Sequence, residues 1–461
     1  MRSNKKKPKA GSILTLILLI ITLLVFLVYA FSSFTSSPIP LPKFPKCPSH
    51  EGEKFLWYAP HSGFSNQLSE LKNALLMAAI LNRTLIVPPV LDHHAVALGS
   101  CPKFRVLSPT QIRLRVWDHV LDLIRDGRYI SMADIIDLSS VSAAVRTIDF
   151  SDFVSLWCGI DLDSICLQGS NTQSSVLNHL KQCGLSLSGS NSNVNKCMHT
   201  VDVDCRTTVW IYKQSDPDGT LDSYQADEQL RMKKKISFVR RRQDVLKHLG
   251  PGSEAHSSTL LAFGSLFTGP YKGSQSYIDI HESPSDDRIQ SFLGMINFLP
   301  FVTEIRNAGK EFAEKKIGPS FLCAQLRLLD GQFKNHQEAT FSVLKQRAEA
   351  VKQKGPLPVH IFVMTDLPKS NWSNSYLGDL DTDSSSFKVH VLDNGDEIVK
   401  QTARKIAASH HKRLSHCPYK LPDLLLYLEE TICSCASLGF VGTAGSTIAD
   451  SIELMRKSSF C

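Results

Sequence analysis

The chain has 461 residues, of which 43% are apolar and 21% are charged. This composition is typical of a folded protein with room for two domains, and it excludes an intrinsically disordered chain. The net charge of +7 does not indicate nucleic-acid binding, because five of the cations precede residue 10 and the rest of the chain carries about +2.

An apolar stretch without charges, residues 13–31, follows the basic N-terminus. At ~1.5 Å per residue it is long enough to cross the hydrocarbon region of a bilayer. The cations before it predict a cytoplasmic N-terminus and a lumenal remainder, so we expect a single-pass type II protein of the Golgi or ER membrane. A cleaved signal peptide is the alternative. The predicted segments are a basic tail (1–11), a signal-anchor (12–34) and a stem rich in proline and serine (35–50).

All twelve cysteines follow this predicted anchor, and an even number there indicates disulfides in an oxidising compartment. Their spacing does not match a zinc site. Cys433 and Cys435 should point apart on a helix, with at least one of them a plain core residue. Asn82 and Asn371 begin sequons for N-glycosylation, although Asn82 fits the end of a helix equally well.

The lumenal part opens with a βαβ pattern. Residues 54–59 and 84–90 are expected as strands, with a turn and an amphipathic helix (66–82) between them, which predicts a parallel sheet. Seven cations fall within residues 231–242; a solvated helix face is favoured over a docking site for an acidic acceptor. We place a domain boundary near residue 285.

Strands and helices alternate in the C-terminal part, so a second doubly wound domain is expected to face the first across a cleft. The predicted domains are 51–285, on the acceptor side, and 286–461, on the nucleotide-sugar side. The C-terminal elements are a helix over 286–318 interrupted at Pro300, strands at 321–326, 360–364, 387–392 and 438–442, and helices at 337–354, 397–408, 423–435 and from 446.

The sequence HSGFSNQ lies between the first strand and its helix. Gly63 permits a positive φ and a close ligand approach, and Ser65 or Asn66 can cap the helix, whose free N–H groups suit an anion or a hydroxyl group. By itself this stretch is equally a capped turn.

Arg327 ends the apolar run FLCAQL, which is typical of a buried strand. Ligands bind at the carboxyl ends of strands in open α/β sheets, and a guanidinium group suits a phosphate because it donates to two oxygens at once. Asp330 follows within a turn and either contacts the same ligand or pairs with the arginine.

The third stretch, FVGTAGSTIAD, ends a strand and starts a helix with Ser446 as its expected N-cap. A diphosphate at that helix start would receive backbone N–H groups and the hydroxyl of Ser446 or Thr447. A structural cap is the alternative. Two acidic runs, 379–383 and 202–204, mimic the DxD motif of metal-dependent transferases, and we interpret both as surface loops.

The motifs HSGFSNQ, LLMAAILNRTLIVPP, FLCAQLR, HIFVMTD and FVGTAGST occur in an order that resembles the plant-type GDP-fucose protein O-fucosyltransferase family over residues 50–457. The resemblance implies a GT-B architecture, with two Rossmann-like domains and a nucleotide-sugar in the cleft. It also implies a metal-independent enzyme that has no cofactor and uses GDP-fucose as its donor substrate.

The resemblance assigns the β-phosphate to Arg327 and assigns Asn66, with Gly63 and Phe64, to the loop that faces the reacting sugar. We predict Arg327 and Asn66 as catalytic. It further implies substrate-binding roles for Thr365, Asp366, Ser446 and Thr447. We also predict Asp330 and Gly445 as substrate-binding residues. The chain departs from the family pattern in Gln325, which replaces a histidine, in the earlier position of Asp330, and in Ile448, which replaces a phenylalanine.

The leading hypothesis is inverting transfer of fucose to a hydroxyl group of a protein or glycan. His61, Glu70 and Asp366 are candidate general bases on chemical grounds alone. The alternatives are a related glycosyltransferase with another donor, such as a rhamnosyltransferase of wall polysaccharides, and an inactive member that binds a glycan or a protein.

Overall fold

The computed structural model describes residues 47, 52–91, 108–166, 170–189, 197–202, 208–211, 238–240, 249–266, 278–279, 287–329, 331–410, 417, 420–458 and 461. The chain divides into two compact units, Met1–Cys47 and Pro48–Cys461. The predicted tail and anchor, and the predicted stem apart from Cys47, lie outside the described residues. Within the described ranges no helix is long and apolar enough to cross a membrane.

Five parallel strands form the N-terminal sheet, in the order β3-β2-β1-β7-β4. The helix α2 (Phe64–Leu81) connects β1 to β2, which confirms the predicted βαβ unit. The three central strands are entirely buried, as their uninterrupted apolar sequences require in a parallel sheet. The strands are β1 (Phe55–Trp57), β2 (Thr84–Val87), β3 (Thr147–Asp149), β4 (Met198–Val201) and β7 (Leu260–Phe263).

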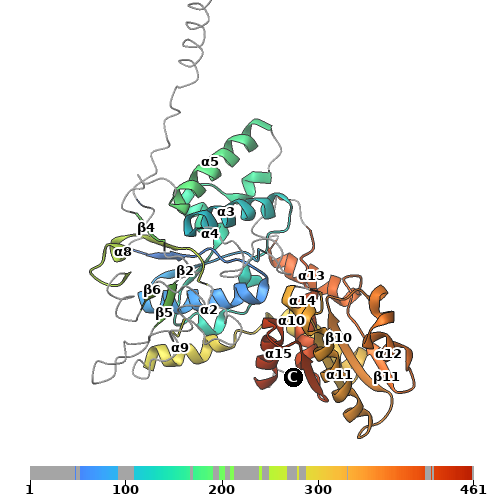
Figure 1. Cartoon of the computed structure of the whole chain (residues 1–461). Helices are drawn as coiled ribbons and strands as arrows, with labels where there is room; N and C mark the ends of the chain where they lie inside the picture. The colour runs from blue at the N-terminus through green and yellow to red at the C-terminus, as the bar shows by residue number, and fades with distance from the viewer. Residues whose placement is uncertain are drawn as a thin grey trace, which may run out of the picture. The chain divides into compact units, whose positions relative to one another are not determined.

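Several helices belong to the same half of the chain as this sheet, which is drawn mainly in blue and green in Figure 1. Ser108 and Gln111 form a capping box at the start of α3, and Asp149 caps α4 by accepting the Ser151 N–H. The helices of this half are α3 (Pro109–Arg125), α4 (Phe150–Cys158), α5 (Ser170–Ser188), α8 (Glu254–Ser257) and α9 (Asp287–Asn297), with short helical turns η1 (Met132–Asp134), η2 (Ser139–Val141) and η3 (Leu162–Cys166).

A small parallel sheet, β6-β5-β8, consists of β5 (Thr208–Ile211), β6 (Phe238–Arg240) and β8 (Ile278–Asp279). Residues 238–240 of the cation-rich run therefore form a strand and not the favoured helix face. The reason is local, because Phe238 and Val239 favour an extended backbone that pairs with β5.

Four parallel strands form the C-terminal sheet in the order β11-β10-β9-β12. Each predicted strand and helix falls within a few residues of its predicted range, whereas α12 and the short turns η5 and η6 were not predicted. The elements are α10 (Thr303–Phe312), η4 (Ala313–Ile317), β9 (Phe321–Leu326), η5 (Gly331–His336), α11 (Gln337–Lys352), β10 (Val359–Thr365), η6 (Lys369–Asn374), α12 (Tyr376–Thr382), β11 (Phe387–His390), α13 (Glu397–His410), α14 (Leu425–Ser434), β12 (Gly439–Gly442) and α15 (Thr447–Lys457).

Residues of β9 alternate between the two faces of this sheet. Leu322 and Ala324 pack with α11 and α12 on one face, while Phe321 and Cys323 join the cluster that contains α10, α13, α14 and α15 on the other. Each fully buried leucine or phenylalanine contributes about 1.5–3 kcal/mol to stability. The chain thus leaves β9 through a helix on one face and reaches β12 through helices on the opposite face, as in a doubly wound sheet.

The start of α2, next to the pocket, is part of the main hydrophobic core. Phe64, the first residue of α2, lies 4.4 Å from the ring centre of Tyr427 in α14, and both rings contact Phe301. These aromatic contacts belong to a single cluster of buried residues that draws on both halves of the chain. They fix the start of α2 against α14.

Disulfides join Cys158 to Cys183, Cys166 to Cys417, Cys323 to Cys433 and Cys435 to Cys461. Cys47 and Cys197 are also disulfide-bonded, and the described residues include no free cysteine. The prediction of disulfides is confirmed. The prediction that Cys433 or Cys435 is a plain core residue is wrong, because Cys433 is bonded to Cys323 in β9 and Cys435 is bonded to Cys461.

Candidate functional site

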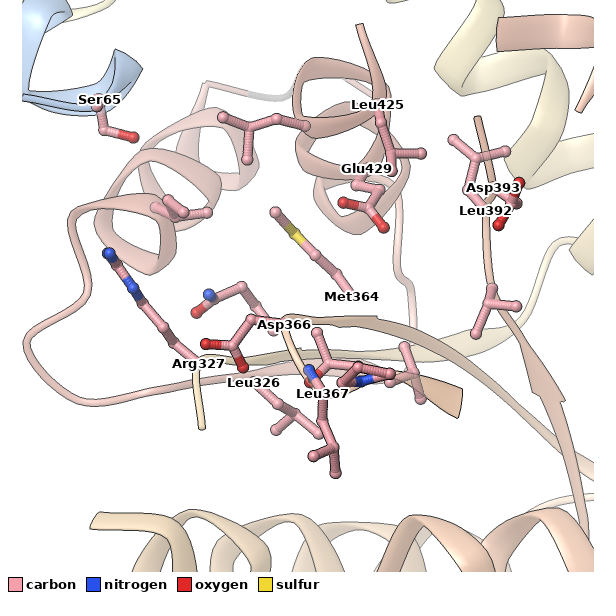
Figure 2. Close-up of a pocket in the computed structure, with 18 of the residues that line it drawn as sticks. Ser65, Leu326, Arg327, Met364, Asp366, Leu367, Leu392, Asp393, Leu425 and Glu429 are labelled. Atoms are coloured by element: carbon pink, nitrogen blue, oxygen red, sulfur yellow. The ribbon is translucent and has the colours of Figure 1, made fainter. Parts of the chain in front are cut away.

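A pocket of about 650 Å³ lies at the carboxyl edge of the C-terminal sheet. Its walls are the residues that follow β9, β10 and β11, together with the starts of α2 and α15 and one side of α14. The pocket has the size of a small-molecule site and lies where the helix connections of β9 and β12 go to opposite faces, the position at which such sheets bind ligands. In Figure 2, Ser65 enters from the N-terminal half, while Arg327, Asp366 and Glu429 come from the C-terminal half.

Arg327 lines this pocket directly after β9. Its guanidinium carbon lies 4.9 Å from the centre of the Phe333 ring, a cation–π contact that restricts the side chain. The backbone N–H of Arg327 donates to Thr443 Oγ1 over 2.9 Å. The arginine is therefore held at both its backbone and its side chain.

Asp366 holds the turn that follows Arg327. One carboxylate oxygen accepts the Leu328 N–H at 2.7 Å and the other accepts the Leu329 N–H at 3.0 Å. Each oxygen accepts one backbone N–H, so Asp366 supports the arginine turn. Its role as a general base stays a prediction. Thr365, the last residue of β10, also lines the pocket and accepts the Leu367 N–H.

Thr443 connects the ends of β9 and β12. Its hydroxyl group donates to the Gln325 carbonyl at 3.1 Å, and its N–H lies 3.0 Å from that carbonyl and 3.3 Å from Gln325 Oε1. Gln325, which is 3% exposed, lines the pocket next to Arg327. Sequence reasoning did not single out Thr443, although it precedes the GST sequence within the third motif.

The start of α2 forms the opposite wall, with Gly63, Phe64, Ser65 and Asn66. Two details of the prediction are wrong. Gly63 has a φ of −71°, and the left-handed residue is Ser62 with a φ of 65°. The helix begins at Phe64 with Gly63 as its N-cap, so neither Ser65 nor Asn66 caps it, because the aromatic contacts of Phe64 already require the helical turn.

The amides of Phe64 and Ser65 at this helix start have no acceptor within the helix. Ser65 Oγ is buried and has no hydrogen-bond partner among the described residues. The Asn66 N–H donates to the Gly63 carbonyl, and its side chain is part of the pocket wall. This wall thus offers amide and hydroxyl groups to a bound ligand.

Thr447, the first residue of α15, lines the pocket together with Ile448. Ser446 is the N-cap, as predicted, but its hydroxyl group makes no capping bond; the group is fully buried and has no partner within the described part of the chain. Gly445 has a φ of 73° and, like Ser446, is not among the pocket residues. Asp330 lies outside the described residues, so its predicted contact stays a prediction.

The other two candidate bases are not in the pocket. His61 and Glu70 are fully buried and lie 2.5 Å apart, His61 Nδ1 to Glu70 Oε1. Neither one lines the cavity. Chemistry alone could not exclude them, because their burial depends on how α2 packs on the sheet.

Glu429 on α14 was missed by sequence reasoning and lines the pocket. Burial, followed by repulsion from Asp423 and Glu430, raises the pKa of Glu429 well above its usual value. A neutral carboxyl group there can donate as well as accept a hydrogen bond. The signal in the sequence was a pair of glutamates within the otherwise apolar run LLLYLEETIC.

Lys369 and Asp393 also border the pocket and were not predicted. Lys369 lies over the Trp372 ring and 3.6 Å from Asp381, one of the carboxylates of the first acidic run. That run lies on α12 and its C-cap and not in the predicted loop. In the second run, Asp202 pairs with the buried Arg113.

The described residues contain no group of three or more His, Cys, Asp or Glu side chains that could hold a metal ion. The two predicted glycosylation sites are both exposed. Asn82 is the left-handed C-cap of α2, which bears out the alternative interpretation, and Asn371 lies in η6.

No protein-family model matches the chain. O-fucosyltransferase 30 of Arabidopsis thaliana is 57% identical over 443 residues, which cover 91% of this chain and 87% of that protein. Among solved structures, POFUT1 in complex with GDP aligns with 88% of this chain and 96% of its own at 13% identity and a TM-score of 0.40. The fucosyltransferase NodZ from Bradyrhizobium aligns with 87% of this chain and 93% of its own at 11% identity and a TM-score of 0.35.

The family rests on the Arabidopsis relative, whose similarity covers 91% of this chain. Its identity to this chain lies far above the level at which common ancestry is in question, and the predicted family resemblance is confirmed. The chain belongs to the O-fucosyltransferase family.

Proposed function

We propose that the protein transfers fucose from GDP-fucose to a hydroxyl group of a protein or glycan, with inversion at the anomeric carbon. Family membership and the name of the Arabidopsis relative, O-fucosyltransferase 30, support fucose as the transferred sugar. The two larger parallel sheets, one in each half of the chain, support a GT-B architecture with the donor in the pocket.

The observation that carries the proposal is the placement of Arg327. A permanent cation lies at the carboxyl end of β9, held by Thr443 and Phe333, in a pocket of nucleotide size. The first turn of α2, with Asn66, forms the facing wall. This arrangement suits a ligand that is anionic at one end and carries a reactive sugar at the other.

The reaction breaks the bond between the anomeric carbon and the GDP oxygen, forms the bond to the acceptor oxygen, and releases GDP and a proton. Negative charge develops on the departing diphosphate, so a fixed guanidinium group stabilises the transition state more than the ground state. Loss of one such preorganised donor costs about 2.7–4 kcal/mol of barrier, a factor of about 100–1,000 in rate. Thr447 and the start of α15 are the second group of donors for the diphosphate.

Arg327 supplies the positive charge at the diphosphate, and we propose that no metal ion is required. The hydrophobic segment 12–34 and the distribution of charge around it support anchoring in the Golgi or ER membrane with the catalytic part in the lumen.

The proposal is tested by calorimetric titration of the protein with GDP and with UDP, each with and without EDTA. We expect GDP to bind, UDP to bind more weakly, and EDTA to leave the GDP affinity unchanged. A preference for UDP would favour a transferase with another donor. The absence of any nucleotide binding would favour a protein that only binds glycans or other proteins.

A further inference from the structure

A cluster of three polar side chains connects three elements next to the α2 wall of the pocket. His61 lies in the loop between β1 and α2, Glu70 in the second turn of α2, and Ser265 just after β7. His61 Nδ1 lies 2.5 Å from Glu70 Oε1, and Ser265 Oγ lies 3.1 Å from both atoms. None of the three residues lines the pocket, so they act on a ligand only through the backbone that carries them.

A serine, a histidine and a glutamate also form hydrolytic triads, but this geometry excludes that role. In a triad the serine nucleophile and the orienting carboxylate contact different nitrogens of the imidazole, whereas here Ser265 and Glu70 both contact Nδ1 of His61. The His61 and Glu70 side chains are also fully buried. The cluster is therefore a structural connection and not a nucleophilic site.

Stability alone does not account for this cluster. Burial raises the pKa of Glu70 although His61 and Ser265 act to lower it, and Glu70 Oε2 has no partner among the described residues. The Tyr58 hydroxyl group beside it is equally buried and unbonded within those residues. Apolar side chains of similar size often serve a core as well or better than such a pair.

Neighbouring side chains connect the same helix start to the sheet. Gln67 Nε2 donates to the Ser62 carbonyl at 2.6 Å while its Oε1 accepts the Leu91 N–H, and Asn73 Nδ2 donates to the Leu266 carbonyl. Ser62 itself is held at a φ of 65°, which is uncommon for a residue other than glycine. Side-chain hydrogen bonds thus hold the loop in a strained conformation immediately before the residues that reach the pocket.

We propose that His61, Glu70 and Ser265 are positioning residues for sugar transfer, because they fix the first turn of α2 so that Ser65 and Asn66 face the arginine at the end of β9. This inference rests on the proposed function. In the proposed function the GDP contacts belong to the C-terminal elements and do not need the cluster. The reacting sugar and its acceptor, in contrast, need the two pocket walls at the correct distance and orientation. A misplacement of about 1 Å at such a site can cost about 100-fold in rate.

The test compares three variants of the full-length protein. Glu70→Gln keeps the size of the side chain but removes its charge, and Ser265→Ala removes one hydroxyl group and leaves the His61–Glu70 contact. Tyr129→Phe is the matched control, because it deletes a buried hydrogen bond, to Asp149, in the same half of the chain but away from the pocket. The readouts are the rate of GDP release from saturating GDP-fucose with water as acceptor, the Kd for GDP, and the melting temperature.

We expect Glu70→Gln to lower the rate by about tenfold or more and Ser265→Ala by about threefold, with less than about a twofold change in the Kd for GDP. Tyr129→Phe should lower only the melting temperature. This inference is overturned, while the proposed function stands, if both variants keep the rate of the control or if their rates fall only in parallel with GDP affinity. If Glu70→Gln does not fold, Ser265→Ala decides. A wild-type protein that neither binds GDP nor releases it would overturn the proposed function itself.

Discussion

Thr443 is the residue that fixes the backbone of Arg327. Its hydroxyl group accepts the Arg327 N–H and donates to the Gln325 carbonyl, so one side chain sets the distance between the ends of β9 and β12. Thr443→Val keeps the shape of the side chain but leaves a backbone N–H without an acceptor, at a cost of about 1–3 kcal/mol. We expect a lower melting temperature together with a GDP affinity reduced by about tenfold, since a displacement of the guanidinium weakens its charge-assisted bonds.

Thr402→Val is the matched control for this prediction. Thr402 is equally buried, but its hydroxyl group donates only to the Ile398 carbonyl within α13. Its loss should not change GDP binding. Equal effects of the two substitutions on GDP affinity, measured by calorimetry, would show that Thr443 acts only through stability.

Glu430 gives the fold a pH dependence. Burial raises its pKa to about 8, one oxygen accepts a hydrogen bond from Ser451, and the other has no partner among the described residues. Because the folded state binds this proton more tightly than the unfolded state, stability is greatest below pH 4.5 and decreases as the pH rises toward 8.

Glu430→Gln should therefore stabilise the protein at pH 8 and have a much smaller effect at pH 5. The stabilisation by Glu430→Gln at pH 8 should exceed that at pH 5 by an amount on the order of 2–4 kcal/mol. Denaturant unfolding of both proteins at the two pH values measures it. Glu453→Gln, at an exposed position of α15, serves as the control. An equal gain for Glu430→Gln at both pH values would contradict the assignment.

Residue types in the three motifs predicted part of the site. Arg327 follows from the end of an apolar strand, and Asn66 and Thr447 from the turns after strands, because parallel strands bring these turns to one edge. Thr365 was predicted only from the family resemblance. Glu429 could not be placed in this way. A helix side chain reaches the pocket only if α14 packs on that face of the sheet at that rotation, and the sequence of α14 is apolar on nearly every side.

At the scale of elements, the sheets were predictable wherever a strand is buried on both faces. The sequences TLIV, FLCAQL and LLAF are uninterrupted apolar runs, and parallel strands need that pattern. The three-stranded sheet β6-β5-β8 was not predicted, because its strands are short and β6 lies in the cation-rich run, whose composition favours a solvated helix. The helix α2 begins two residues earlier than predicted because Phe64 packs against Tyr427, a contact that local capping preferences do not reveal.

The packing of α3 against α5 gives a prediction at this scale. Gly184 lies within α5, and an added Cβ would collide with the ring of Trp117 in α3, which is completely buried. In an open helix the change from glycine to alanine is favourable by about 1 kcal/mol. Here overpacking costs about 1–3 kcal/mol, so Gly184→Ala should lower the melting temperature.

Gly294→Ala in α9 is the matched control, because nothing lies within 4 Å of the added Cβ. Thermal unfolding should show a small gain for this variant and a loss for Gly184→Ala. Two gains would mean that Trp117 moves aside without cost and that the helices pack less tightly than the structure indicates.

At the scale of the whole molecule, aromatic packing and disulfides connect segments far apart in the sequence. Cys166 and Cys417 are separated by 251 positions, and Phe64 meets Phe301 and Tyr427 in one core. Cysteine number indicated that disulfides form but not which cysteines pair, since pairing depends on the folded arrangement. The family follows from the Arabidopsis relative, while the donor, the acceptor and the membrane anchor are proposals that rest on the pocket and on the N-terminal sequence.

The most direct test of the account is the GDP affinity of the wild type, Arg327→Ala and Arg404→Ala by calorimetric titration. Arg404 is an exposed arginine on α13 that pairs with Glu397 and lies outside the pocket, so it controls for the loss of one positive charge. We predict that Arg327→Ala weakens GDP binding by about 10- to 100-fold and that Arg404→Ala leaves it unchanged. Unchanged GDP affinity in Arg327→Ala would contradict the central claim that this arginine binds the departing diphosphate.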